Sequence, residues 1–180
     1  MEAFIVLGTS VIGLIFFTTL SRYIRCPSDK ILVIFDKKGN QPQIMQCIHG
    51  DAAFVWPVIQ DYAFLDLTPN PYDIELQDTR TKDGFGLEGI AQFVVCISLE
   101  KKDMPIAAKR LLPLSRKEIR ALEEVLLSTL LRKSIIDCDS SLIKNDRIKF
   151  DNKIELAIKK EFSSLGLELA NCNLNKVKLA

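Results

Sequence analysis

The hydrophobic and polar positions divide the chain into an uncharged segment and two stretches with different periods. Residues 3–20 contain no charged side chain, residues 30–100 show short apolar or alternating runs, and apolar positions in residues 101–180 recur at helical spacing. Alternation with a period of two is typical of strands, and steps of three and four residues are typical of helices. The pattern therefore predicts an apolar segment, then strands, then helices.

The first segment reads AFIVLGTSVIGLIFFTTL and has the length of a membrane span. As a helix, residues 3–20 would rise about 27 Å at about 1.5 Å per residue, close to the hydrocarbon core of about 30 Å. We predict that residues 3–20 form a transmembrane anchor. The side chains expected to face lipid are Phe4, Ile5, Val6, Leu7, Val11, Ile12, Leu14, Ile15, Phe16, Phe17 and Leu20.

Other interpretations of this segment fit less well. A cleaved signal peptide needs a basic region before the apolar run, whereas the only charge there is Glu2. A lipoprotein signal would need small residues before Cys26, where Arg25 stands. A buried core helix would show a polar face, which this segment lacks. A re-entrant or interfacial segment is a further alternative, but a spanning anchor is favoured.

The residues after the anchor predict its orientation. Arg22 and Arg25 follow it directly, and Tyr23 stands where an aromatic ring would anchor at the interface. Because positive charge flanks only this end, the rest of the chain is expected on the cytoplasmic side. Cys26 lies at headgroup level and is a candidate for S-acylation. The alternative is an unmodified thiol that leads into the first strand.

Residues 30–100 predict an antiparallel sheet of about six strands with short connections. Two runs separated by the turn residues 36–40 predict a hairpin. The predicted strands cover residues 30–35, 43–48, 53–56, 62–67, 72–76 and 93–99. The motif Gly84-x-Gly86-x-x-Gly89 lies between a turn and a strand, so it does not have the strand-to-helix context of a dinucleotide site.

The second half predicts a short helix over residues 105–112 and two longer helices. Ser115-Arg-Lys-Glu118 is a capping box that opens the first of these. Its predicted apolar face consists of Ile119, Leu122, Leu126 and Leu130.

The second long helix is predicted from about Asp146 to Leu165, with Gly166 as its stop. Its predicted apolar stripe consists of Phe150, Ile154, Ile158 and Phe162. Residues 167–174 read as a closing strand with one break in the alternation. Strands followed by helices predict an α+β fold class.

Composition excludes several classes of protein. The chain of 180 residues is 48% hydrophobic, with 24 basic against 23 acidic side chains. It therefore lacks the basic surplus of nucleic-acid binders, and nucleic acid is not an expected partner. The five cysteines are widely scattered, so neither a disulfide framework nor a CxxC site is expected.

Catalytic chemistry is not expected. His49 is the single histidine, which excludes a multi-histidine metal site and leaves little for a hydrolase, and we expect it to be a solvated or backbone-bonded loop residue. Glu123 and Glu124 are interpreted as a solvated helix face rather than an acid–base pair. No catalytic residue, cofactor or metal is predicted, and the chain is expected not to be an enzyme.

Three stretches carry a resemblance to a known family. Residues 26–34 read CPSDKILVI, and residues 47–62 read CIHGDAAFVWPVIQDY and continue to FLDLTP at 64–69. Both resemble the opening of the SPFH (Band 7) domain of bacterial flotillin-like proteins. The pattern from Arg147 through Leu165-Gly166-Leu167 to Val177 is similar to the helix–strand end of the same domain.

The resemblance implies an SPFH domain over residues 26–180, with a β-rich part at 26–100 and an α/β part at 101–180. It implies a single-pass protein of the bacterial inner membrane, with its domain on the cytoplasmic side. The implied role is a scaffold that organises membrane microdomains, with the lipid bilayer, further copies of the chain and other membrane proteins as partners. The alternative is an adaptor that regulates a membrane protease, as stomatin-like and prohibitin-like relatives do.

One feature of flotillins is missing from this sequence. Flotillins continue into a long coiled coil that drives oligomerisation, whereas no sustained heptad pattern occurs here. Either the chain is a truncated or minimal relative, or it assembles through the domain alone.

Overall fold

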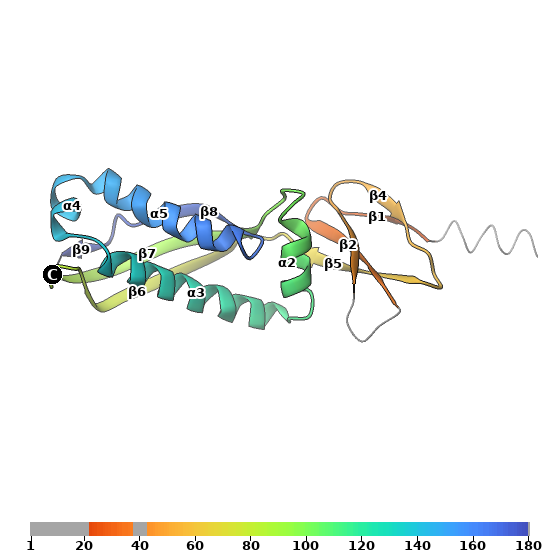
Figure 1. The fold of residues 1–180 in the computed structure, drawn as a ribbon, viewed down its shortest axis with the longest axis horizontal. Helices are drawn as coiled ribbons and strands as arrows, with labels where there is room; N and C mark the ends of the chain where they lie inside the picture. The colour runs from red at the N-terminus through yellow and green to blue at the C-terminus, as the bar shows by residue number, and fades with distance from the viewer. Residues whose placement is uncertain (1–21, 38–42, 180) are drawn as a thin grey trace, which may run out of the picture. The chain divides into compact units, whose positions relative to one another are not determined.

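The computed structural model describes residues 22–37 and 43–179, which fall into two compact units (Figure 1). Unit 1 ends at Asp66, and unit 2 begins at Leu67. The predicted anchor at residues 3–20 lies outside the described residues. Among the described residues, no helix combines the length and the apolar composition needed to cross a bilayer.

Unit 1 consists of two small antiparallel sheets. Its strands are β1 (Tyr23–Arg25), β2 (Lys30–Asp36), β3 (Ile44–Ile48), β4 (Ala52–Phe54) and β5 (Gln60–Asp66). One sheet has the order β3-β2-β5, and β1 pairs with β4 in the other. The predicted hairpin is confirmed, since Leu32 lies opposite Ile48 and Val33 opposite Cys47.

The core of unit 1 forms around the central strand β2. Four consecutive residues of β2, from Ile31 to Ile34, are almost completely buried. Leu32 and Ile34 pack in one cluster with Cys26 and Val55. Because Cys26 and Val55 follow β1 and β4, this cluster ties the two sheets together.

Unit 2 contains a twisted antiparallel sheet. Its strands are β6 (Asn70–Arg80), β7 (Gly86–Ile97), β8 (Leu167–Asn173) and β9 (Lys178–Leu179). The order is β6-β7-β8, and β9 also pairs with β7. Tyr72, Ile74 and Leu76 are buried at alternate positions, as predicted. The predicted break in the last strand is a bulge, because Val94 lies opposite Asn171 but Val95 opposite Leu169.

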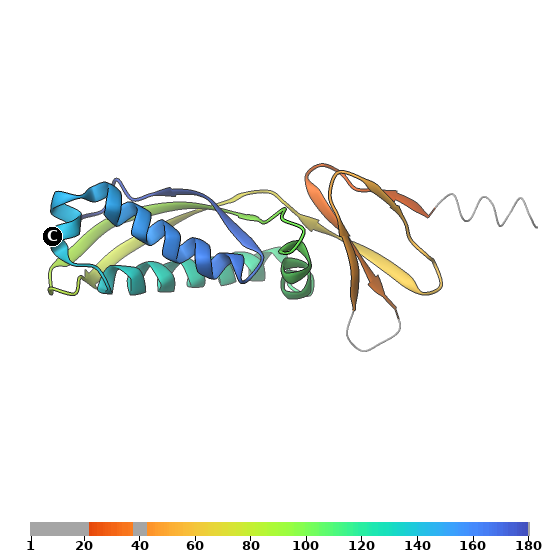
Figure 2. The same ribbon diagram turned by 45° about the horizontal axis from the view of Figure 1, so that its top comes forward.

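The helices of unit 2 are α2 (Met104–Leu111), α3 (Arg116–Ile136), α4 (Ser140–Asn145) and α5 (Arg147–Ser163). Helices α3 and α5 contact each other and lie on one face of the sheet, against β6 and β8 respectively (Figure 2). Helix α4 was not predicted, since six residues are too few to show a helical period. The α+β class and the antiparallel sheets are confirmed.

The predicted apolar face of α3 is wrong by one residue. The capping box is present, with Glu118 N–H donating to Ser115 Oγ and Ser115 N–H donating to the Glu118 carboxylate. However, Leu122 is exposed, and the buried line consists of Glu123, Leu127, Leu131, Ser134 and Ile135. Leucines are adjacent at 126–127 and 130–131, so the sequence contains two apolar lines, and packing selects the second.

The predicted end of α5 at Gly166 is confirmed, and packing against α2 explains why this residue is a glycine. The four residues of the predicted α5 stripe are fully buried. Gly166 then adopts φ of +78°, and a Cβ there would lie 2.5 Å from the backbone N of Ala107 in α2. The backbone of this turn therefore touches α2 directly, and a glycine is required by both conformation and space.

Glycines of the Gly84-x-Gly86-x-x-Gly89 motif serve the sheet, as their context suggested. Gly84 lies in a turn with φ of +82°, and Gly86 begins β7. At Gly89, a Cβ would lie 2.1 Å from the carbonyl oxygen of Lys176. The C-terminal segment therefore crosses this strand at close range. Arg147 fixes the same segment, because its guanidinium donates to the carbonyls of Leu174 and Val177.

Candidate functional site

An exposed group of apolar side chains lies in unit 1 beside the first described residues. We call Tyr23, Phe54, Trp56, Pro57, Val58 and Ile59 the apolar tip. Tyr23 lies opposite Phe54 in the β1–β4 ladder, and the amide of Val55 donates to the carbonyl of Arg22 at 3.1 Å. Residues directly opposite in an antiparallel pair have their side chains on the same face. The tip therefore combines two segments that are 31 positions apart in the sequence.

The turn at Trp56–Gln60 presents the tip to solvent. The amide of Gln60 donates to the Trp56 carbonyl at 2.9 Å, and the amide of Trp56 donates to Gln60 Oε1 at 3.0 Å. Pro57 restricts the backbone at the start of this turn. The Phe54 and Trp56 rings pack edge to face at 5.3 Å. These bonds close the turn, and the side chains of Trp56, Val58 and Ile59 on it are exposed.

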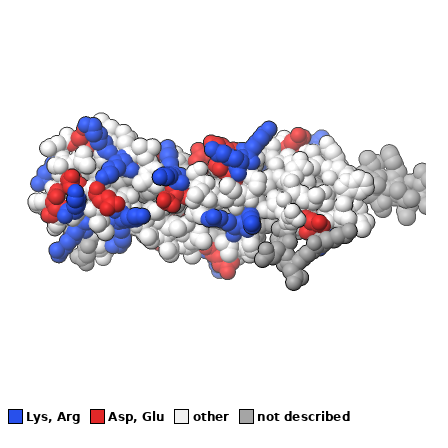
Figure 3. All heavy atoms as spheres, viewed as in Figure 1, with Lys and Arg blue, Asp and Glu red and all other residues white. Residues whose placement is uncertain are grey.

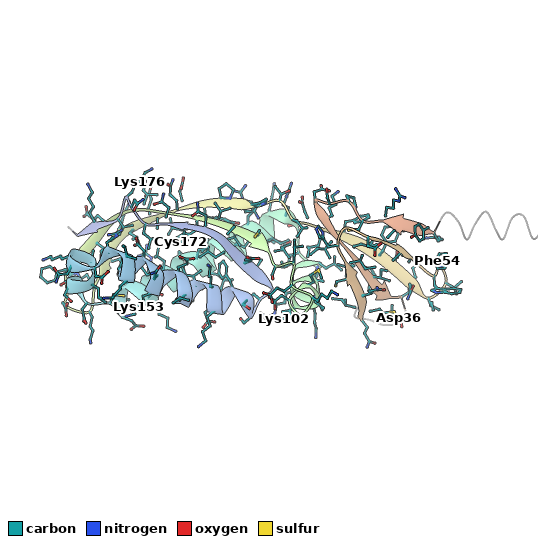
Figure 4. All side chains as sticks on the ribbon, turned by 90° about the horizontal axis from the view of Figure 1, so that it is seen from above. Asp36, Phe54, Lys102, Lys153, Cys172 and Lys176 are labelled. Carbon is teal, nitrogen blue, oxygen red and sulfur yellow. The ribbon has the colours of Figure 1, made fainter. Side chains whose placement is uncertain are left out.

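The exposure of these side chains is unusual for such residues. Trp56 is 59% exposed, Val58 is 82% exposed, and Tyr23 and Ile59 are also exposed. Single exposed apolar residues are normal, whereas a contiguous group indicates an interaction surface. Figure 4 labels Phe54 near the start of β1, and the visible surface at this end of unit 1 is mainly uncharged in Figure 3.

The predicted flanking residues Arg22 and Arg25 adjoin the apolar tip. Arg25 is exposed and lies on the same face of β1 as Tyr23, since the two are separated by one residue. Other basic residues of the region have partners: Lys37 pairs with Asp61 at 3.6 Å, and Lys30 lies over the Phe64 ring. Arginine beside aromatic and aliphatic groups is the composition of a membrane–water interface.

Cys26, the candidate for lipidation, is buried in the core of unit 1. Its Sγ lies 3.1 Å from the Lys30 carbonyl and 3.3 Å from the Ile48 carbonyl, so the thiol can donate to backbone oxygens. A thiol in this position cannot be reached by an acyl donor unless the core opens. The placement therefore favours the alternative, an unmodified thiol leading into the first strand.

His49 makes a backbone contact rather than a catalytic one. Its Nδ1 lies 3.0 Å from the carbonyl oxygen of Lys30, which accepts a hydrogen bond from the ring. This confirms the interpretation as a backbone-bonded loop histidine. In the part of the chain that the structure describes, no three His, Cys, Asp or Glu side chains gather in a way that would suit a metal ion.

A buried polar cluster in unit 2 was missed from the sequence. Glu123 is only 2% exposed, which corrects its interpretation as part of a solvated helix face. Its carboxylate accepts hydrogen bonds from the Tyr72 hydroxyl and from Asn70 Nδ2 at 3.1 Å. Arg120 lies over the Tyr72 ring at 5.9 Å. The signal available in the sequence was that Glu123 falls on the same helical line as Leu127 and Leu131.

The electrostatics of this cluster follow from burial. Desolvation raises the pKa of Glu123, while hydrogen bonds from Tyr72 and Asn70 and the charge of Arg120 oppose the shift. Desolvation and the bond to Glu123 also raise the pKa of Tyr72. The phenol therefore remains a donor to the carboxylate. These contacts join α3 to β6, so we interpret the cluster as a structural connection.

The sequence model of the family described as SPFH domain / Band 7 family matches residues 24–180. No curated protein matches the chain. The matched range begins within β1 and contains most of the apolar tip.

Proposed function

We propose a function from one premise: the chain belongs to the SPFH domain / Band 7 family. This family is associated with membrane scaffolding and membrane microdomains. We propose that the chain is a flotillin-like scaffold module, attached to the inner membrane by residues 3–20. It organises membrane microdomains and recruits membrane proteins at the cytoplasmic face.

The observation that carries this proposal is the apolar tip beside Arg22. Exposed Trp56, Val58 and Ile59 are unfavourable in water, and burying one large apolar side chain is worth about 1.5–3 kcal/mol. Their neighbours Arg22 and Arg25 lie directly after the uncharged segment. A bilayer surface supplies both an apolar layer for the tip and anionic headgroups for the arginines.

The proposed mechanism is passive. The anchor confines the chain to two dimensions, which raises the effective concentration of its copies and partners. The apolar tip enters the interface and holds unit 1 against the bilayer. Each arginine near an anionic leaflet contributes about 1 kcal/mol. The chain thereby presents its remaining surfaces to other proteins at the membrane.

Trp56 is the only tryptophan in the chain, so its fluorescence tests the tip directly. We expect its emission to shift to shorter wavelength when the full chain is placed in anionic vesicles. We also expect quenching by lipids that carry bromine near the headgroup. Val58→Asp should reduce this quenching at least severalfold, because a carboxylate at the tip opposes insertion.

Phe64→Asp is the matched control, because Phe64 is an exposed apolar residue of unit 1 on β5, outside the tip. It should leave the quenching of Trp56 unchanged. If Trp56 in the unaltered chain is quenched only by iodide in the aqueous phase and not by the brominated lipids, the tip does not contact the membrane.

A further inference from the structure

The sheet of unit 2 has one face that no described helix or strand of this unit covers. Helices α3 and α5 lie on the other face, where Tyr72, Ile74 and Phe93 are buried. Figure 4 shows these helices on one side of the strands and only side chains on the other. We call this second side the open face of unit 2. Because side chains alternate along a strand, it consists of the residues between the buried ones.

A mainly apolar row follows the middle strand of the open face. The row consists of Ile90, Gln92, Val94 and Cys96 on β7, and each of them is partly exposed. The solvated face of an antiparallel sheet usually has polar side chains, whereas three of these four are apolar. At about 3.4 Å per residue, the row is about 20 Å long, which matches about four turns of an α-helix.

Carboxylates flank this row on both sides. Asp73 and Glu75 lie on β6, Glu168 lies on β8, and each is directly opposite a member of the row in the ladder with β7. All three side chains are exposed. Neighbouring strands are about 4.8 Å apart, so the acidic groups lie close to the apolar row. The open face therefore combines an apolar centre with two negative margins.

The described residues do not neutralise these carboxylates. Gln92 Nε2 donates to Asp73 at 2.9 Å, and Gln77 Nε2 donates to Glu75 at 3.1 Å, but both donors are uncharged. Within the described part of unit 2, no ion pair within 4.0 Å includes Asp73, Glu75 or Glu168. Their charge is thus available to a partner.

The basic residues nearest to this surface are engaged or distant. The charge of Lys159 acts on Glu168, but its ammonium pairs with Glu155 on α5 at 2.6 Å. Arg80 and Lys178 lie at the other end of the open face, beside the turn that joins β6 to β7. The part of the open face around the apolar row therefore stays negative.

We propose that the open face binds a basic amphipathic helix of another protein. The apolar stripe of this helix lies along the β7 row, and its Lys or Arg side chains reach the carboxylates on β6 and β8. Helices packed on both faces of a sheet form a stable layer arrangement, and amphipathic helices bind through their apolar face. The two negative margins require positive charge on both edges of the stripe.

Charge complementarity favours this occupant over others. Lipid headgroups and nucleic acids present phosphates, which the three carboxylates repel. An acidic helix is repelled in the same way, and an uncharged one leaves the carboxylates without a partner. The open face contains no residue of the apolar tip, so this inference goes beyond the proposed function and does not depend on it.

The first test measures capture of a synthetic peptide by the full chain, immobilised in uncharged detergent. The probe is an 18-residue helical peptide with leucines along one stripe and lysines along both edges of the stripe. Asp73→Lys combined with Glu75→Lys replaces attraction by repulsion at the β6 margin. We expect this double variant to bind the peptide at least tenfold more weakly than the unaltered chain.

Glu124→Lys combined with Glu161→Lys is the matched control. Both residues are exposed on the helices of unit 2, and the pair changes the net charge by the same amount. Any uptake of the peptide by detergent is common to all variants. The control should weaken binding less than twofold. Equal weakening by both double variants would show attraction to net charge alone and would overturn the proposal.

A reversed peptide tests the pairing of charges directly. It has glutamates in place of lysines along one edge of the stripe. We expect it to bind the Asp73→Lys, Glu75→Lys variant at least threefold more tightly than it binds the unaltered chain. Circular dichroism and urea unfolding verify that this variant is folded. If the folded variant shows no such gain, the β6 margin does not contact the helix and the proposal is wrong.

Sedimentation equilibrium of the same variants tests a second copy of the chain as the occupant. If the Asp73→Lys, Glu75→Lys variant loses self-association but captures the lysine peptide normally, the open face belongs to a second copy and the proposal is overturned. Val58→Asp at the apolar tip should leave peptide capture unchanged. Loss of the Trp56 quenching by lipid therefore contradicts only the proposed function, and loss of peptide capture contradicts only this inference.

Discussion

Single residues in this chain behave according to their neighbours rather than their type. Glu123 has the sequence context of a surface residue, beside Glu124 on a charged helix, yet it is buried under β6. Cys26 lies near the predicted membrane boundary, yet its thiol faces the core of unit 1. In both cases, the decisive partner comes from a distant part of the sequence: Tyr72 for Glu123, and Ile48 for Cys26.

The buried carboxyl of Glu123 predicts a pH-dependent stability. Because its pKa is raised above the ordinary 4.5 in the folded state, the folded chain binds this proton more tightly than the unfolded chain. Stability from this group is therefore present below pH 4.5 and is lost as the pH rises through the folded pKa. Glu123→Gln has no such proton. We expect the stability of the unaltered chain relative to Glu123→Gln to fall between pH 4.5 and pH 7.

Urea unfolding in detergent, followed by circular dichroism at both pH values, measures this difference. Glu124→Gln is the control, because it removes one carboxylate from the same helix at an exposed position outside the buried cluster. A constant difference between Glu123→Gln and the unaltered chain across this range would mean that the Glu123 proton is bound equally in both states.

At the scale of elements, local signals specify the ends of helices well and their packing less well. The capping box of α3 and the glycine after α5 act within a few residues, so the sequence contains all the information. The buried face of α3 depends on which apolar line meets β6. Two adjacent lines are available, and the bond between Glu123 and Tyr72 belongs to only one of them.

Gly166 joins α5 to α2, and this predicts a large effect of adding one methyl group. In Gly166→Ala, the Cβ would meet the backbone N of Ala107 at 2.5 Å and the Asp103 carbonyl at 2.7 Å. The left-handed conformation costs roughly 1–2 kcal/mol, and overpacking adds about 1–3 kcal/mol. Gly84→Ala is the matched control in unit 2, with φ of +82° and no atom within 4 Å of the added Cβ.

We therefore expect Gly166→Ala to destabilise unit 2 by clearly more than Gly84→Ala in urea unfolding. The difference between the two variants measures the contact with α2 alone, because both carry the same conformational strain. Equal losses of stability would show that α2 moves away from the turn without cost.

At the scale of the whole molecule, the chain combines an uncharged segment with two folded units. The alternation in residues 70–97 indicates strands, and these strands, β6 and β7, share a core with α3, α5 and β8 in unit 2. The spacing of hydrophobic positions indicates secondary structure only. The division into units depends on which strands pair, and β7 pairs with β8, about 75 positions along the chain.

Deleting residues 1–21 tests membrane attachment by the whole chain. We expect the shortened chain in the soluble fraction and the full chain on membranes, because the uncharged segment supplies most of the apolar area for insertion. The measurement is fractionation at about 1 M salt, where the Debye length of about 3 Å removes attraction to headgroups. A shortened chain that stays on membranes at this salt concentration would show that residues 1–21 are not the anchor.

The sequence by itself determined the α+β class, the antiparallel strands, the helix ends and the family, because alternation, capping and glycine stops act over a few residues. Only the tertiary structure decided that Glu123 and Cys26 are buried, that Val125 faces outward, and that Tyr23 meets Phe54 and Trp56. These outcomes depend on contacts between segments far apart in the chain. A local sequence pattern cannot predict which of these residues are buried, because a face of a helix or strand becomes buried only when the element that packs on it is in place.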